Sequence, residues 1–385
     1  MNRKVVLAIN AAWNIANFRG GLVRGLQAEG WDVVAMAPRD THVHRVEALG
    51  CRFVELPMSG SGTNPIHDLR LYRRFKAALA AERPAAFLGY TIKPNIWGSL
   101  AAHALGIPVI NNVAGLGTAF VRRSWLTVVA RVLYRRAFWQ SRCVVFQNEE
   151  DRAYFIESGL VERTHTVRVP GSGVDLTAFA PQPLPSQGPG QPTRYLFIGR
   201  LLRDKGVAEL AAASRVLRAQ GLDIDVALLG FVDADNPSAI SRREIDAWQA
   251  EGVIRYLGSA DDVRPHIAAA HCIVLPSFYR EGVPRTLLEA AAMARPLITT
   301  DSVGCRDAVD DGINGYLVRP RDTDHLAAQM QRFAGLDSEK RQAMADASRR
   351  KVERVFDEQF VVDEYIHLLR ELAVAPPSLQ PSGAG

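Results

Sequence analysis

Two acidic side chains, Glu281 and Glu289, lie with seven residues between them in the segment PSFYREGVPRTLLEAAA. The segment follows the apolar run Cys272–Leu275, which predicts a buried strand, so it should form a strand-end loop that leads into a helix. Glu289 is then expected over a turn inside that helix. Carboxylates at such a place can accept hydrogen bonds from the hydroxyl groups of a sugar or a ribose.

The backbone between the two acids suits an anion. Gly282 lets the main chain approach a ligand closely, and Pro284 is expected at the first helical position, where a proline loses no helical hydrogen bond. The amides near Val283–Thr286 would then point at a negatively charged group. Acids that can bind sugar hydroxyls therefore lie beside amides that can bind a diphosphate. This combination indicates a binding site for a sugar nucleotide. The alternative is a solvated acid followed by an ordinary amphipathic helix.

A second strand-end loop, FIGRLLRDKG, carries cations. Gly199 predicts a tight turn, and Arg200 and Lys205 lie on the loop. Arginine can hold phosphate oxygens through two parallel hydrogen bonds, and lysine adds a compact positive charge. The alternative is a basic loop that is only solvated.

The first predicted strand of the chain ends in the polar segment NAAWNIANFR. Asn14 and Asn17 either cap the helix that follows or contact a ligand, and Arg19 can reach a phosphate. Both interpretations of the asparagines stay open.

Two further loops of the first half follow predicted strands. Lys93 in GYTIKPN is a candidate for an acceptor phosphate, and a surface lysine is the alternative. Gly115 and Gly117 in NNVAGLGTAF suit a backbone pressed against a substrate, or they form a turn.

The segment VRRSWLTVVARVLYRRAFWQSR has six arginines and no acid. At helical spacing many of its apolar residues gather on one side, as in helices that lie in an anionic membrane interface. The residues expected to touch a membrane are Arg122, Arg123, Trp125, Arg135, Arg136 and Trp139. An ordinary helix with buried tryptophans and solvated arginines is the alternative. Binding to nucleic acid is disfavoured because the stretch lacks the context of a nucleic-acid-binding fold.

Short apolar runs that alternate with helical stretches position all these loops. Strands are predicted at Lys4–Ile9, Val33–Ala37, Phe53–Leu56, Ala85–Gly89, Val109–Asn112, Cys143–Gln147, Tyr195–Ile198, Asp225–Leu229, Val253–Leu257, Cys272–Leu275, Pro296–Thr299 and Tyr316–Val318. Helices are predicted at Arg19–Glu29, Asp68–Glu82, Asn95–Leu105 and Asp357–Leu372. This alternation indicates parallel sheets with helices on both faces. The stretch PQPLPSQGPGQPT interrupts it and predicts an exposed linker between two halves.

Length and composition agree with two globular domains. The chain has 385 residues, of which 48% are hydrophobic and 23% charged, and this excludes a wholly disordered chain, a collagen and a coiled coil. A net charge of +5 suggests an anionic partner without choosing its class. The four cysteines, far apart, are expected as reduced, mostly buried thiols of a cytosolic protein. No apolar run is long enough to span a membrane, and the apolar start is expected as a strand rather than a signal peptide.

Together these segments resemble glycosyltransferase family 4. Glu281-Gly282-Val283-Pro284 with Leu288-Glu289-Ala290 is similar to the EX7E signature of the family, and Gly199-Arg200 with Lys205-Gly206 is similar to its donor-diphosphate loop. The segment GSGVD, residues 171–175, resembles the family's NGVD segment except at Ser172. Residues 301–304 and 311–315 resemble two later landmarks.

The resemblance implies an α/β GT-B fold, in which two Rossmann-like domains face each other across a cleft, and it allows a C-terminal helix that crosses back to the N-terminal domain. The expected parts are an acceptor-binding domain at 1–178, a linker at 179–193, a nucleotide-sugar-binding domain at 194–356, the crossing helix at 357–373 and a disordered tail at 374–385.

The resemblance also implies retaining transfer of a sugar from a nucleotide sugar, with no metal ion or other cofactor. Arg200 and Lys205 would hold the diphosphate and stabilise the leaving group, Glu281 would hold the transferred sugar, and Glu289 would bind the ribose. The donor site is therefore expected to comprise Gly199, Arg200, Lys205, Glu281, Gly282, Val283, Pro284 and Glu289, of which Arg200, Lys205 and Glu281 are the catalytic candidates. The acceptor site is expected to comprise Asn14, Asn17, Arg19, Lys93, Gly115 and Gly117.

The segments Asn10–Arg19, Thr91–Gly98 and Asn112–Phe120 resemble a narrower subgroup, the transferases that extend undecaprenyl-diphosphate-linked sugars, N-acetylgalactosaminyl transferases among them. Relatives often carry an acid where Ala114 stands here. The subgroup implies a UDP-sugar donor, with GDP left open, a polyprenyl-diphosphate-linked acceptor, and a cytoplasmic enzyme peripheral on the anionic inner face of the membrane. Two alternatives stay open: a nucleotide-sugar epimerase of the same fold, and a non-catalytic lipid- or nucleotide-binding subunit.

Overall fold

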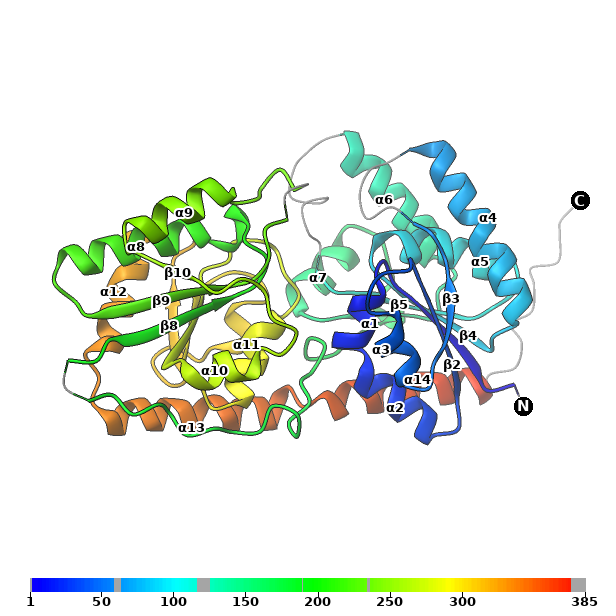
Figure 1. Ribbon diagram of the computed structural model, residues 1–385. Helices are drawn as coiled ribbons and strands as arrows, with labels where there is room; N and C mark the ends of the chain where they lie inside the picture. Colours follow the sequence, from blue (N-terminus) through cyan, green and yellow to red (C-terminus); the bar gives the residue numbers. More distant parts are fainter. Residues whose placement is uncertain (1, 59–63, 116–124, 189, 234–235, 375–385) are drawn as a thin grey trace, which may run out of the picture. The chain divides into compact units, whose positions relative to one another are not determined.

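The computed structural model describes every residue except 1, 59–63, 116–124, 189, 234–235 and 375–385. Its contacts divide the chain into two compact units (Figure 1). Unit 1 comprises residues 1–114, 122–172 and 358–385, and unit 2 comprises residues 115–121 and 173–357. The last described helix therefore belongs to the unit that contains the start of the chain.

Unit 1 is built on a seven-stranded parallel sheet in the order β3-β2-β1-β4-β5-β6-β7. Its strands are β1 (Lys4–Ala8), β2 (Asp32–Ala37), β3 (Arg52–Glu55), β4 (Ala86–Tyr90), β5 (Val109–Val113), β6 (Cys143–Phe146) and β7 (Thr166–Arg168). Its helices are α1 (Ala12–Phe18), α2 (Gly20–Ala28), α3 (Val43–Ala48), α4 (Pro65–Glu82), the π-helix η1 (Pro94–Gly98), α5 (Ser99–His103), α6 (Trp125–Phe138), α7 (Glu149–Glu157), η3 (Arg163–His165) and α14 (Glu358–Val374).

The alternation of side chains along β1 shows how both faces of this sheet are covered. Val5 and Leu7 lie in a core that also contains residues of α2 and α14, whereas Val6 and Ala8 lie in a core with residues of α4 and α5. Because strands buried on both faces carry apolar residues at successive positions, β1 is apolar without interruption from Val5 to Ala8.

Unit 2 contains a six-stranded parallel sheet in the order β10-β9-β8-β11-β12-β13. Its strands are β8 (Thr193–Ile198), β9 (Ile224–Leu229), β10 (Arg255–Tyr256), β11 (Cys272–Leu275), β12 (Leu297–Thr300) and β13 (Gly315–Val318). Its helices are η4 (Arg203–Lys205), α8 (Val207–Ala219), α9 (Arg242–Ala250), α10 (Arg264–Ala269), α11 (Arg285–Ala292), η5 (Arg306–Ala308), α12 (Thr323–Ala334) and α13 (Ser338–Val355). One apolar core joins strands and helices of this unit.

The helix expected at Arg19–Glu29 is confirmed as α2, within one residue at each end. The separate helix α1 was not predicted, and Arg19, with φ −127° and ψ 5°, separates it from α2. The helix expected at Asn95–Leu105 begins instead as the π-helix η1 and continues as α5.

The proline-rich segment lies inside unit 2, since the division of contacts falls at 172/173 rather than at the expected boundary after residue 178. Arg295, which is fully buried, holds this segment: its guanidinium donates to the carbonyl oxygens of Gln182 and Pro183 at 2.9 Å each. The same guanidinium also donates to the carbonyls of Ile267 and Ala268. Residues 182–183 are therefore fastened to the body of unit 2. The predicted tail falls almost entirely on residues 375–385, outside the described residues.

The four cysteines are all buried, and none of them is in a disulfide. Among the residues that the structure describes, no helix is both long and apolar enough to cross a membrane.

Candidate active site

Three strand-end loops of unit 2 meet at the carboxyl edge of its sheet, because β8, β11 and β12 are neighbours in the strand order. The amides of Phe278 and Tyr279, in the loop after β11, both donate to the carbonyl oxygen of Asp204 at 3.0 Å. Gly206 has a φ of 75°, and a Cβ atom there would lie 2.2 Å from the carbonyl oxygen of Pro276. The loop after β8 is thus pressed against the loop after β11.

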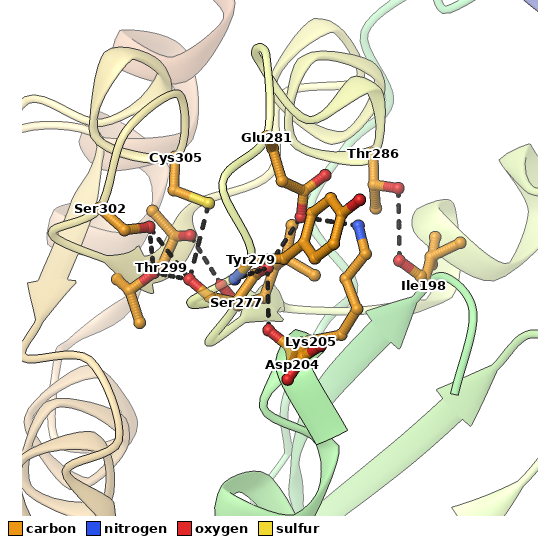
Figure 2. Close-up of polar contacts among 12 residues, drawn as sticks. Ile198, Asp204, Lys205, Ser277, Tyr279, Glu281, Thr286, Thr299, Ser302 and Cys305 are labelled. Atoms are coloured by element: carbon orange, nitrogen blue, oxygen red, sulfur yellow. Dashed lines mark hydrogen bonds and ion pairs between the residues drawn. The ribbon is translucent and has the colours of Figure 1, made fainter. Parts of the chain in front are cut away.

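This contact brings Lys205 and Glu281 together, as Figure 2 shows. Lys205 Nζ lies 2.6 Å from Glu281 Oε1, which also accepts a hydrogen bond of 2.8 Å from Ser277 Oγ. The two charged side chains are only 14% and 13% exposed. The ammonium and the carboxylate satisfy each other here, and a ligand with an anionic group beside hydroxyl groups can replace each partner of the pair.

The helix after this loop, α11, begins one residue later than expected. Pro284 is its N-cap, with φ −61° and ψ 118°, so the prediction of Pro284 as the first helical residue is wrong. The extended ψ of Pro284 ends the Glu281–Val283 loop, and its carbonyl oxygen accepts from the amide of Leu287 at 3.0 Å. Thr286 Oγ1 donates to the carbonyl oxygen of Ile198 at 3.3 Å, which joins the helix start to the end of β8 (Figure 2).

Glu289 lies inside α11, as expected, and Arg285 one turn earlier binds it. Arg285 Nε is 3.0 Å from Glu289 Oε1, and the two side chains are 12% and 13% exposed. Burial raises the pKa of the Glu289 carboxyl, and the nearby Arg285 guanidinium offsets part of this rise. Glu289 is therefore a largely enclosed acceptor whose ion-pair partner comes from its own helix.

Arg200 is the most exposed of the predicted donor residues that carry a charge. Its side chain is 41% exposed, and Nη1 lies 3.3 Å from Asp233 Oδ2 in the loop after β9. Gly199 donates its amide to the carbonyl oxygen of Leu229 at 3.0 Å, which continues the pairing of β8 with β9. The sequence did not single out Asp233.

The loop after β12 is the third loop at the carboxyl edge of the sheet of unit 2. The sequence did not predict most of the contacts that this loop makes. Thr300 donates to the carbonyl oxygen of Ser277. Ser302 donates to the same oxygen at 3.0 Å (Figure 2). Gly304 has a φ of 79°, and a Cβ atom there would lie 1.4 Å from the carbonyl oxygen of Gly282. The sequence did hold a signal for the hydrogen bonds of this loop, because small polar residues stand at the ends of neighbouring strands.

The predicted acceptor residues of the first segment lie on or just after α1. Asn14 Nδ2 donates to Asn10 Oδ1 at 3.0 Å, and Asn17 Nδ2 donates to the carbonyl oxygen of Trp13 at 2.9 Å. Neither asparagine caps the helix, because the N-cap is Ala11. The capping interpretation is therefore wrong.

Arg19 is buried, with its guanidinium 4.4 Å from the centre of the Tyr90 ring. Lys93 is 15% exposed and lies 3.7 Å from Asp68 Oδ1. Gly115 has a φ of 123° and is grouped with unit 2 by its contacts, whereas Gly117 lies outside the described residues. The acceptor roles of these residues stay predictions.

The basic segment forms α6, and only part of it can be described. Arg122 and Arg123 lie outside the described residues, and nothing is described of the side chain of Trp125. Arg135 and Arg136 are exposed, and Trp139 is 71% exposed just past the end of the helix. The alternative of a buried tryptophan is thus wrong for Trp139. Across the described ranges, no cluster of three or more His, Cys, Asp and Glu side chains is arranged to hold a metal ion.

Comparison with known proteins finds two family matches. The model of the glycosyl transferase 4-like domain matches residues 15–172, and the model of the group 1 glycosyl transferases matches residues 192–335. The N,N'-diacetylbacillosaminyl-diphospho-undecaprenol alpha-1,3-N-acetylgalactosaminyltransferase of Campylobacter jejuni is 24% identical over 373 residues, which cover 93% of this chain and 96% of that protein.

Two solved structures show the same fold. Sucrose-phosphate synthase from Thermosynechococcus elongatus matches 97% of this chain and all of its own, with a TM-score of 0.79 and 19% identity. HepE from Anabaena, solved in complex with UDP, matches 96% of this chain and all of its own, with a TM-score of 0.75 and 16% identity. With two family matches side by side along the chain and a Rossmann-like parallel sheet in each unit, this protein belongs to the family 4 (group 1) glycosyltransferases of GT-B fold.

Proposed function

We propose that this glycosyltransferase moves a hexose or an N-acetylhexosamine, with retention of configuration, from a UDP-sugar to a saccharide carried on a polyprenyl diphosphate in bacterial surface glycan assembly. The observation that carries the proposal is the Lys205–Glu281 pair, which places a cation and a carboxylate 2.6 Å apart at the edge where α11 begins. A nucleotide sugar has a diphosphate that can bind the lysine and sugar hydroxyls that can donate hydrogen bonds to the carboxylate.

Each residue then has a defined part in the reaction. Lys205 and Arg200 place positive charge where the diphosphate gains charge as its bond to the anomeric carbon breaks. Glu281 accepts hydrogen bonds from hydroxyls of the transferred sugar, and Glu289 accepts them from the ribose. The acceptor hydroxyl forms the new bond on the face that UDP leaves, and its proton passes to the departing diphosphate. This chemistry needs no metal ion, so turnover should persist in EDTA.

A lipid-linked acceptor is supported by the likeness to the Campylobacter enzyme, whose name gives an undecaprenol-linked substrate. The exposed face of α6 supports a position at an anionic inner-leaflet membrane surface. Val128 and Val132 are each 63% exposed, and at helical spacing they share a face with Arg135 and Trp139. A helix face that mixes exposed valine, tryptophan and arginine fits the boundary between headgroups and acyl chains.

The enzymatic test is a panel of UDP- and GDP-sugars with undecaprenyl-diphosphate-linked acceptors, read by mass and by the anomeric configuration of the product. The proposal expects one UDP-sugar to be consumed only with the acceptor present, with retention, and E281Q to lose turnover. Epimerisation of a nucleotide sugar without acceptor would instead indicate an epimerase. Binding of UDP with no turnover in any combination would indicate a binding subunit.

The membrane test is flotation with vesicles that contain anionic lipid. We expect R135Q/R136Q and W139S to float less than the parent protein, because each removes charge or apolar area from the exposed face of α6. The matched control is R242Q/R243Q, which removes two exposed arginines from α9. Equal flotation of R135Q/R136Q and this control would contradict the membrane role of α6.

A further inference from the structure

Unit 1 carries a basic cavity of about 420 Å³ at the carboxyl edge of its own sheet. Its walls come from the segments that follow β2, β3 and β4 and from the first half of α4. Arg39 follows β2, Lys93 follows β4, and Arg70 and Arg74 project from α4. Ligands of open parallel sheets bind at this edge, where strand-end loops converge.

The charge balance of the cavity is strongly positive. Arg39, Arg70, Arg74 and Lys93 line it together with one carboxylate, that of Glu55, so the cations of the lining outnumber its acids by three. Glu55 is engaged by Arg39 at 2.8 Å. Even with Asp68, which lies 3.7 Å from Lys93, the cations outnumber the acids by two. A cavity with this excess attracts a ligand of more than one negative charge.

The two arginines of α4 are placed to act on the same ligand. Arg70 and Arg74 are one helical turn apart and both line the cavity, whereas Phe75 and Leu79 pack into the core and Leu71 lies at the border of core and cavity. Arg74 Nη1 donates to the carbonyl oxygen of Pro57 at 3.1 Å, which fixes its direction. Arg70 is exposed and makes no hydrogen bond or ion pair to any residue in the described ranges. Two guanidinium groups so arranged can each hold one phosphoryl group through parallel hydrogen bonds.

We infer that this cavity binds a diphosphate, and that the diphosphate is the one carried by the lipid-linked acceptor. The preference for diphosphate rests on the cavity alone, whereas its source rests on the proposed function. The cavity belongs to unit 1, and all residues expected to hold the donor diphosphate belong to unit 2. The cavity is therefore a second site for phosphate chemistry in the chain.

The first test uses inorganic diphosphate, titrated calorimetrically into the full chain at constant ionic strength. We expect R70Q/R74Q to weaken one class of binding by about tenfold or more, because two charge-assisted contacts are lost. The matched control is R73Q/K76Q, which removes two exposed cations of α4 that do not line the cavity. The variant R200Q/K205Q should leave this class unchanged. Equal binding by R70Q/R74Q and R73Q/K76Q would overturn the inference, and the single variant R70Q repeats the test if the double variant fails to fold.

The second test identifies the source of the diphosphate. With an undecaprenyl-diphosphate-linked acceptor, R70Q/R74Q should raise the acceptor KM about tenfold or more and leave kcat and the KM of the UDP-sugar within about twofold. An unchanged acceptor KM beside weakened binding of inorganic diphosphate would overturn the lipid-linked source and assign the cavity to a free diphosphate. If no lipid-linked acceptor is used at all, the proposed function fails, while the calorimetric result still decides whether the cavity binds diphosphate.

Discussion

Gly304 offers the sharpest test of how the donor loops are held. Its φ of 79° is unfavourable for any other residue, and a Cβ atom there would lie 1.4 Å from the carbonyl oxygen of Gly282 and 2.8 Å from that of Glu281. G304A therefore forces either the turn after β12 or the Glu281–Gly282 loop to move. Gly312 is the matched control, since its φ is 76° and nothing lies within 4 Å of the added Cβ.

The expected free energies separate the two variants. The left-handed conformation costs an alanine about 1–2 kcal/mol, and this cost applies to G312A and G304A alike. G304A adds the cost of overpacking, about 1–3 kcal/mol. We therefore expect a loss of about 1–2 kcal/mol of unfolding free energy in G312A and about 2–5 kcal/mol in G304A.

Urea denaturation followed by circular dichroism measures the free energy of unfolding of each variant. Calorimetric titration with UDP measures how each substitution changes the affinity of the donor site. G304A should bind UDP more weakly, because the displaced segment leads directly into the amides near Val283–Thr286 that are expected to face the diphosphate, whereas G312A should bind UDP like the parent protein. The reasoning fails if both variants lose the same stability and bind UDP equally well, since the contact with Gly282 would then cost nothing.

Three further predictions concern buried ionisable groups. Burial raises the pKa of Glu289 above 4.5, so the contribution of this carboxyl group to stability is present in acid and is lost as pH rises. Urea denaturation from pH 4.5 to 7 should therefore show E289Q gaining stability relative to the parent protein. A difference between the two proteins that stays constant with pH would contradict this. Burial lowers the pKa of His271 to about 4, so the protein should lose stability as pH falls from about 6.5 toward 4. Thermal unfolding at a series of pH values should show a smaller loss in H271N than in the parent protein. R295M should lower the unfolding free energy by about 2–5 kcal/mol in urea, because carbonyl groups around the buried guanidinium lose their donor, and a change within about 0.5 kcal/mol would contradict the role of Arg295.

The regular elements could be predicted because their signals are local. The predicted strand Cys272–Leu275 coincides with β11, and Tyr195–Ile198 lies within β8, since short apolar runs between helical stretches need no tertiary information. The break at Arg19 could not be predicted in the same way. At the break, Arg19 packs on the ring of Tyr90 in β4, which is distant in the sequence.

The candidate site shows the same limit. The residue types and their loops were identified from the sequence, but the pairing of Lys205 with Glu281 depends on β8 and β11 being neighbours in the sheet. Strand order is set by packing of the whole unit rather than by local pattern. For the same reason, a run of prolines could not predict that residues 182–183 belong to unit 2. Their hydrogen bonds to Arg295 join residues more than a hundred positions apart in the sequence.

The return of α14 to unit 1 has a consequence for how the protein is made. Val361, Val362 and Tyr365 fill the core formed with α2 and β1, and Tyr365 accepts a hydrogen bond of 3.0 Å from Asn112. These residues leave the ribosome only after all of residues 173–357 have been synthesised. At about 5–20 residues per second this delay lasts roughly 10–40 s. The domain that is translated first is therefore the last to be completed, and during that interval the apolar residues that α14 later covers lack their packing partners.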